Sequence, residues 1–169
     1  LKAFTVALFS TGIGAVIIAL TALVGLFTKA GREGAEFGKA ISTLRAITSK
    51  TAEELENLSD QAKELGASTA FTASQVVSLQ TELAKLGFTI QEIEDSTPAI
   101  LDLAASLDVS LAEAAAFAGS SVKAFGLDTK DTQRLVDVFA KSTSASALDF
   151  DKLRESMKLV APTARAVGL

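Results

Sequence analysis

The sequence has 169 residues, of which 49% are apolar and 21% are charged, and its formal net charge is −4. It contains no Cys, His, Trp or Tyr, and ten Phe supply all of its aromatic side chains. The absence of Cys excludes a disulfide framework and thiolate metal sites in this chain, and the absence of His excludes the usual zinc sites and histidine-based acid–base catalysis.

The first feature along the chain is an uncharged run of 26 residues, from Ala3 to Thr28. A bilayer core needs roughly 20 apolar residues in helical form, so this run is long enough to span a membrane with some tilt. It exceeds the apolar part of a signal peptide, and no clear small-residue cleavage site follows it. We expect a long N-terminal apolar helix that either enters a membrane or lies buried inside a larger assembly.

Small side chains line one side of this predicted apolar helix. Ser10 and Gly14 are four residues apart, and Ala15 and Ala19 repeat the spacing. Ridges of small side chains let apolar helices approach closely in lipid. The pair Gly12-x-Gly14 does not predict a dinucleotide site, because no third glycine follows at the required spacing and no strand precedes it. The predicted membrane or helix-packing site consists of Ser10, Thr11, Gly12, Gly14, Ala15, Ile17, Ala19 and Leu20.

The charge is divided unevenly along the rest of the chain. Residues 29–50 carry five basic and two acidic side chains, whereas residues 51–169 carry ten basic and eighteen acidic ones. Because phosphate binding relies on clustered Lys and Arg, we expect no sequence-specific nucleic-acid binding by the larger part. The basic stretch fits a solvated helix face, with lipid headgroups or DNA as alternative contacts. We therefore divide the chain into an apolar helix (1–30), a basic connecting helix (31–50) and a helical region (51–169).

The helical region contains repeated signals for helix starts. A capping box has Ser or Thr at the N-cap and Glu or Gln three residues later, so that each side chain bonds to the other residue's backbone N–H. Four such boxes begin at Thr51, Thr72, Thr89 and Ser110. Pro98, two residues after Ser96, fits the first turn of a further helix, where its missing N–H costs nothing.

Glycines supply the matching stop signals. Gly66, Gly87, Gly126 and Gly168 each follow a periodic segment, and glycine favours the left-handed backbone that ends many helices. No segment has the two-residue alternation of a strand, so the chain is predicted to be all-α. The predicted helices span residues 3–28, 32–48, 52–65, 73–86, 90–94, 97–107, 111–125, 129–142 and 150–167, the last one bent at Pro162.

Apolar positions within these helices recur every three or four residues. One such stripe contains Leu111, Ala115, Ala118, Val122 and Phe125, a spacing typical of amphipathic helices. Comparable stripes consist of Val76, Leu79, Leu83 and Leu86, and of Leu135, Val138 and Phe139. Because each helix is too short to be stable alone in water, the stripes have to pack on one another. We expect a compact bundle of short amphipathic helices.

No residue pattern predicts catalysis. The acids Asp149, Asp151 and Glu155 lie close together in the sequence, but Asp149 is better explained as a helix N-cap and the other two as residues of the first turns. Ser and Thr have no histidine to activate them, and the lysines are scattered. The chain is therefore predicted not to be an enzyme and to need no cofactor or metal.

Several segments occur in an order that resembles the core region of phage tail tape-measure proteins. They are 65–75 (Leu-Gly-Ala-Ser-Thr-Ala-Phe-Thr-Ala-Ser-Gln), 83–88 (Leu-Ala-Lys-Leu-Gly-Phe), 97–105, 124–128, 137–141 and 157–162. Residues 1–4 and 10–14 also resemble the apolar segment of many such proteins. Each motif is weak by itself, but their common order makes the resemblance over residues 51–169 specific.

The resemblance implies a structural virion protein that lies in the lumen of the tail tube, sets the tail length and helps the genome pass through the host membrane. Its implied partners are other copies of itself, the proteins of the tail tube and of the baseplate or tail tip, and the host membrane during ejection. A helix rises about 1.5 Å per residue, so 169 residues would measure only a short distance. We therefore expect the chain to be a section of a longer protein, which its first residue, Leu1, also suggests.

Other functions are compatible with the same residues. The chain could be the tape measure of a tail-like bacteriocin or a contractile injection particle, which the sequence does not distinguish from a phage. A membrane-anchored helical binding protein is a second class, in which the basic stretch would remain cytoplasmic. A pore-forming toxin is a third class.

Overall fold

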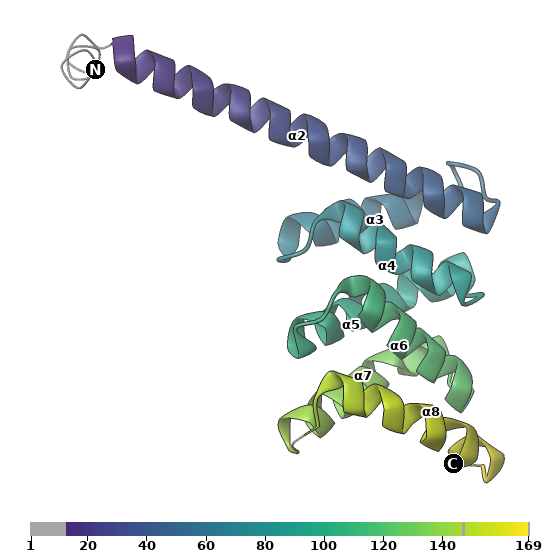
Figure 1. The fold of residues 1–169 in the computed structure, drawn as a ribbon. Helices are drawn as coiled ribbons and strands as arrows, with labels where there is room; N and C mark the ends of the chain where they lie inside the picture. Colours follow the sequence, from purple (N-terminus) through teal and green to yellow (C-terminus); the bar gives the residue numbers. More distant parts are fainter. Residues whose placement is uncertain (1–12, 147, 169) are drawn as a thin grey trace. The chain divides into compact units, whose positions relative to one another are not determined.

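The computed structural model describes residues 13–146 and 148–168, and the side chains of residues 31–146 and 148–168. These residues form seven α-helices and one 3-10 turn and contain no strand (Figure 1), so the all-α prediction is confirmed. The chain divides into two units, residues 1–38 and residues 39–169. The second unit contains most of the helices and is described in detail below.

Helix α2 (Ile13–Thr48) is continuous over 36 residues. The predicted break between residues 28 and 32 is therefore wrong, because Gly31 and Gly34 lie inside the helix. An interior glycine costs only about 1 kcal/mol, which is too little to end a long helix. The first ten residues of the predicted apolar helix, 3–12, lie outside the described residues. Among the residues that the structure describes, no helix is long and apolar enough to cross a bilayer.

The remaining helices follow the sequence prediction closely, with corrections at three places. They are α3 (Glu56–Ser68), α4 (Ala73–Lys85), α5 (Ile90–Leu107), α6 (Leu111–Phe125), the 3-10 turn η1 (Thr129–Asp131), α7 (Thr132–Ser144) and α8 (Phe150–Ala166). Helix α3 begins later and ends later than expected, and the segment from residue 129 starts as a 3-10 turn. The two helices predicted around Ser96 are one helix, α5, with Pro98 in its interior.

The predicted caps form as hydrogen-bonded pairs. Thr72, Thr89 and Ser110 each make the reciprocal bonds of a capping box and begin α4, α5 and α6. The Thr51 box also forms, with the Thr51 amide 2.9 Å from a Glu54 carboxylate oxygen, but a turn follows it and α3 starts five residues later. The caps at Thr72, Thr89 and Ser110 thus determine where α4 to α6 begin.

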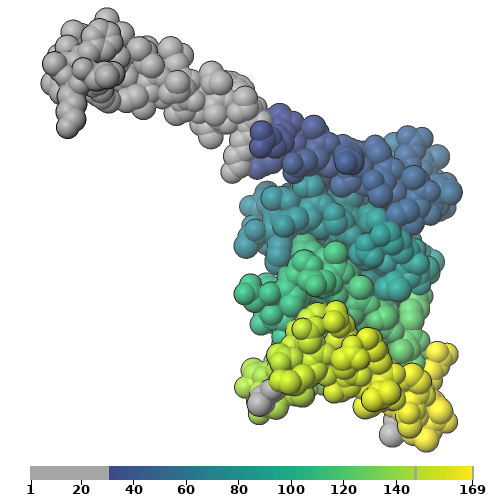
Figure 2. Space-filling model, in the orientation of Figure 1, coloured from purple at the N-terminus to yellow at the C-terminus, as the bar shows by residue number. Residues whose placement is uncertain are grey.

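Helices of the second unit stack as successive pairs rather than surrounding one shared core. Within one row α3 packs on α5 and α5 on α7, and within the other row α4 packs on α6 and α6 on α8. Figure 1 shows the pairs α3–α4, α5–α6 and α7–α8 following one another, and the space-filling view shows the same order as successive colours (Figure 2). The predicted compact bundle is therefore corrected to a layered stack, in which each helix pair mainly contacts the pairs before and after it.

The second helices of the three pairs, α4, α6 and α8, begin and end with the same kinds of residue. The N-caps Thr72, Ser110 and Asp149 lie 38 and 39 residues apart along the chain. Gly87, Gly126 and Gly168 follow the three helices with positive φ angles of 79°, 70° and 78°, as predicted for these three positions. A period of about 40 residues with one helix pair per period is the pattern of helical repeat proteins.

The core of the stack is aliphatic and includes stripes that the sequence predicted. Val76, Leu79 and Leu83 of α4 are fully buried. The predicted stripe on α7 is only partly correct, because Phe139 is buried whereas Val138 is 54% exposed.

Two glycines inside helices allow neighbouring helices to approach closely. A Cβ on Gly66 would lie 2.5 Å from the backbone nitrogen of Ala73, at the start of α4. A Cβ on Gly119 would lie 2.7 Å from a methyl carbon of Leu86. Gly66 was expected to end its helix, but α3 continues to Ser68. Its role is to let the end of α3 contact the start of α4.

A polar network explains how α5 continues through Pro98. Proline has no N–H to donate to the carbonyl four residues earlier, which here belongs to Glu94. The side-chain amide of Gln61, on α3, donates to that carbonyl at 2.9 Å. The fully buried Gln80 of α4 in turn donates to the Leu58 carbonyl at 3.0 Å and to the side-chain oxygen of Gln61 at 3.3 Å. The network links α3 and α4, which form the first pair, to α5 of the second pair.

We predict that Gln61→Met lowers the free energy of unfolding of the second unit by about 1–3 kcal/mol, because the Glu94 carbonyl loses its donor. In a Pro98→Ala background the new amide of residue 98 can donate to that carbonyl, so the same substitution should cost less. Urea denaturation of the four chains of this double-mutant cycle measures the difference. Equal losses of unfolding free energy in the two backgrounds would show that Gln61 does not replace the hydrogen bond that Pro98 cannot donate to the Glu94 carbonyl.

Candidate interaction groove between α6 and α8

The structure does not test the site predicted in the apolar run. Gly14, Ala15, Ile17, Ala19 and Leu20 lie on α2, but their side chains are outside the described ones. Ser10, Thr11 and Gly12 lie outside the described residues altogether. The proposed ridge of small side chains therefore stays a prediction.

The acidic residues near the start of α8 are structural, as expected. Asp149 is the N-cap of α8, and its carboxylate accepts from the Lys152 amide at 2.9 Å. All three acids pair with a base three residues later, at 2.7, 2.9 and 2.6 Å for Asp149–Lys152, Asp151–Arg154 and Glu155–Lys158. Among the described residues no group of three or more acids could hold a metal ion.

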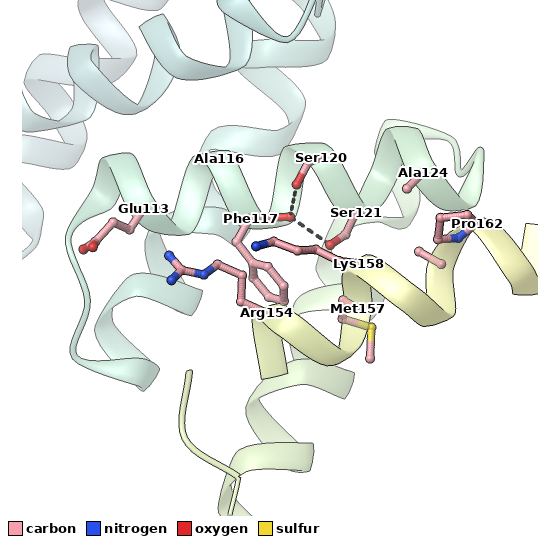
Figure 3. A pocket seen from close by; sticks show the side chains of 11 residues that line it. Glu113, Ala116, Phe117, Ser120, Ser121, Ala124, Arg154, Met157, Lys158 and Pro162 are labelled. Atoms are coloured by element: carbon pink, nitrogen blue, oxygen red, sulfur yellow. Dashed lines mark hydrogen bonds between the residues drawn. The ribbon is translucent and has the colours of Figure 1, made fainter. Parts of the chain in front are cut away.

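A groove of about 310 Å³ lies between α6 and α8. Figure 3 shows its lining, with Glu113 toward one end and Pro162 toward the other. Its walls consist of Glu113, Ala116, Phe117, Ser120, Ser121 and Ala124 on α6, and of Arg154, Met157, Lys158, Ala161 and Pro162 on α8. The small side chains of α6 leave the space that the groove occupies.

Phe117, which lines the groove, belongs to a cluster of three phenylalanines. The Phe117 ring lies 4.7 Å from the Phe139 ring of α7 and 5.3 Å from the Phe150 ring of α8, measured between ring centroids. The second pair meets edge to face, the arrangement that the charge distribution of aromatic rings favours. The sequence contained no sign of this cluster, because its members are 22 and 11 residues apart and meet only when α6, α7 and α8 stack.

The rim of the groove is charged, and these charges are already partnered. The Ser110 side chain and amide donate to the Glu113 carboxylate at 2.6 and 3.2 Å and lower the pKa of that carboxyl. The Lys158 ammonium, through its hydrogen bond to Glu155, lowers the pKa of the Glu155 carboxyl in the same way. Arg154 pairs with Asp151 at 2.9 Å. Glu113 and Glu155 therefore stay ionised at neutral pH, and the rim has a fixed pattern of charge.

The polar groups inside the groove are not arranged for chemistry. The hydroxyls of Ser120 and Ser121 donate to the Phe117 carbonyl of their own helix at 3.0 and 2.8 Å, as the dashed lines in Figure 3 show. A serine nucleophile needs a neighbouring base to accept its proton, whereas both of these hydroxyls donate to a backbone carbonyl. The groove offers an apolar surface with a charged rim, which is suited to contact with another apolar side chain or helix.

We predict that Ser110→Ala raises the pKa of Glu113 toward its ordinary value, because the hydroxyl that bonds to the ionised carboxylate is lost. A lowered folded-state pKa contributes stability that is present above the unfolded value, about 4.3, and is lost as the pH falls through the folded value. In the variant the contribution of Glu113 to stability should therefore be smaller, and its loss should end at a higher pH, whereas the pH at which the loss begins, near the unfolded value, stays the same. An NMR titration of the Glu113 carboxyl carbon checks this.

Glu54 is the internal control for this titration. The Lys50 ammonium and the Thr51 amide donate to its carboxylate and lower its pKa to about 2, and none of these groups is changed in the variant. An unchanged Glu113 titration alongside an unchanged Glu54 titration would contradict the role assigned to the Ser110 hydroxyl.

Comparison with known proteins gives one family. A model of the family described as "Phage-related minor tail protein" matches residues 59–169. The chain is 36% identical over 170 residues to the "Tape measure protein" of Pneumococcus phage Dp-1. The matched region covers 99% of this chain and 15% of that protein. It is 30% identical over 138 residues to the "Probable tape measure protein" of Escherichia phage P2, which covers 80% of this chain and 17% of that protein. The chain spans less than a fifth of these relatives, and no solved structure matches it.

Proposed function

Because the chain belongs to the phage-related minor tail proteins, and within them resembles tape-measure proteins, we propose that it is a section of a structural virion protein that occupies the lumen of the tail tube and sets the tail length. The observation that carries the proposal is the 36% identity to a tape measure protein over 99% of the chain. The proposed partners are other copies of the same protein, the tail tube proteins and the proteins of the baseplate or tail tip.

The helical content supports a role as a ruler. A continuous α-helix has a constant rise of about 1.5 Å per residue, so its length follows directly from the number of residues. Helix α2, with 36 residues, would measure about 54 Å on this scale. The stacked part measures far less per residue, because neighbouring helices pack about 8–10 Å apart and one period contains 38 or 39 residues.

We predict that an in-frame deletion in a continuous helical section elsewhere in the full gene shortens the tail by about 1.5 Å per deleted residue. Negative-stain electron microscopy of parent and deletion particles measures the length. The matched comparison is deletion of residues 88–126, which removes α5 and α6 and joins Gly87 to Leu127. Its expected effect is about 10 Å if the stack persists in the tail, or about 58 Å if the segment is drawn out as one helix.

Unchanged tail lengths after the first deletion would contradict a ruler and would favour the membrane-anchored binding protein. The same experiment with a tail-like bacteriocin or injection particle would give the same shortening. The type of particle is therefore identified by its source and not by this measurement.

We further propose that residues 3–28 help the genome pass through the host membrane. This part of the proposal rests on the uncharged sequence of the run, because the described helices include none that could span a bilayer. The alternative of a helix buried inside the tail assembly requires no contact with lipid.

We predict that Ile17→Arg impairs genome delivery while tails of normal length still assemble, because a charge at mid-bilayer costs about 2.5–3.5 kcal/mol on insertion scales. Ile17→Leu is the control and should deliver the genome normally. Plaque counts and tail lengths of the two variants test the proposal. Normal infectivity of the arginine variant would argue strongly against membrane insertion.

A further inference from the structure

The face of α8 that lines the groove continues for one turn beyond it. Lys158 and Ala161 line the groove, and Arg165 lies four residues after Ala161, on the same side of the helix. The Arg165 guanidinium donates to the Lys123 carbonyl, near the end of α6, at 3.2 Å. Helices α6 and α8 are therefore joined again just past the end of the groove at which Figure 3 shows Pro162.

The end of α6 provides a fitted seat for Arg165. Gly126 ends α6 with a φ of 70°, and a Cβ at this position would lie 3.4 Å from the Arg165 Nε, so the guanidinium lies directly against the glycine. A Cβ on Gly87, which ends α4 with a similar φ, would meet no described atom within 4 Å. The Lys123 carbonyl is among the last carbonyls of α6, where the helix dipole favours a nearby cation.

The preceding pair has a cation at the equivalent position. Lys123 and Arg165 each lie three residues before the glycine at the end of their helix, Gly126 and Gly168. The Lys123 ammonium lies 4.3 Å from the centroid of the Phe88 ring, which directly follows the glycine at the end of α4. In both pairs a cation of the second helix thus reaches the end of the preceding helix in the same row, and the Arg165 contact repeats an arrangement of the stack.

Little else holds the segment after Pro162. Proline has no N–H to donate to the Lys158 carbonyl, so α8 lacks one backbone hydrogen bond at this point. Ala161 is buried, whereas most of residues 163–168 are exposed. Within the described part of the chain, the hydrogen bond that ties residues 163–168 to another helix is the one that Arg165 donates. Segments with few buried contacts and exposed hydrogen bonds open at a low cost in free energy.

We propose that residues 163–168 form a strap, hinged at Pro162, which Arg165 latches onto the end of α6 and which closes one end of the groove. With the latch closed, α8 is held against α6 on both sides of Pro162. With the latch open, the groove becomes accessible from its Pro162 end. The inference concerns access to the groove and goes beyond the function proposed for the tail.

Met157 reports on the groove directly, because it lines the groove and is the single methionine of the sequence. The test measures the NMR signal of its methyl group and the hydrogen exchange of the backbone amides of residues 164–167 in the 169-residue chain. Arg165→Gln should make these amides exchange about two- to tenfold faster and should shift the methyl signal, because the strap then leaves α6 part of the time. Arg165→Lys keeps a cation that can donate to the same carbonyl, so it should resemble the parent in both measurements.

Salt provides a second comparison on the same samples. A cation at a helix end is screened by salt, so high salt should speed the exchange of residues 164–167 in the parent and have little effect in Arg165→Gln. The amides of residues 76–83, in α4, serve as the internal control and should exchange equally in all variants.

Three results would overturn the proposal. Equal exchange of residues 164–167 in the parent and in Arg165→Gln would show that Arg165 does not hold the strap. Faster exchange with an unchanged Met157 signal would remove the link to the groove. Faster exchange that extends to residues 76–83 would show a loss of general stability in place of the opening of a local latch.

Discussion

Burial of aliphatic side chains between successive helix pairs is the interaction on which residues 39–169 depend. Helices of 13 to 18 residues are marginal in water by themselves, and each of them gains stability only from the helices before and after it. Val76 of α4 and Ile100 of α5 are completely buried in this way. Since every pair relies mainly on its neighbours, the structure grows in one direction, and its two ends have different requirements from its middle.

Polar and aromatic contacts select one arrangement among those that burial alone would allow. The side chain of Gln61 compensates for the hydrogen bond that Pro98 cannot make, and Gln80 connects this point to α4. A buried hydrogen-bonding group without a partner costs free energy, so a shift of α3 along α5 would be penalised. At the next level of the stack the ring of Phe117 contacts Phe139 and Phe150. The glutamine network therefore fixes how the first helix pair packs on the second, and the phenylalanine cluster fixes how the second pair packs on the third.

The stacked arrangement bears on how such a chain could act in a tail. A continuous helix such as α2 adds about 1.5 Å of length per residue, whereas a stacked pair adds only one helix-packing distance for about 39 residues. A tape-measure protein that contains both kinds of structure would have sections that measure and sections that fold compactly. The groove between α6 and α8 combines an apolar lining with a charged rim.

The sequence by itself determined the all-α class, the starts of α4, α5 and α6 at their capping boxes, and the membership of the tape-measure family, because these depend on local chemistry and on motifs in a common order. Ser110 and Gly126 delimit α6 at the predicted residues through bonds to their immediate neighbours. Only the tertiary structure decided that α5 passes through Pro98, that Gly66 serves close packing, and that Phe117 joins two distant phenylalanines. These outcomes depend on side chains that approach from other helices, such as Gln61, and no local pattern encodes which helix will lie beside which. For the same reason the stripes predicted a core, but only the stacking of the helices showed that Leu86 and Val138 remain exposed.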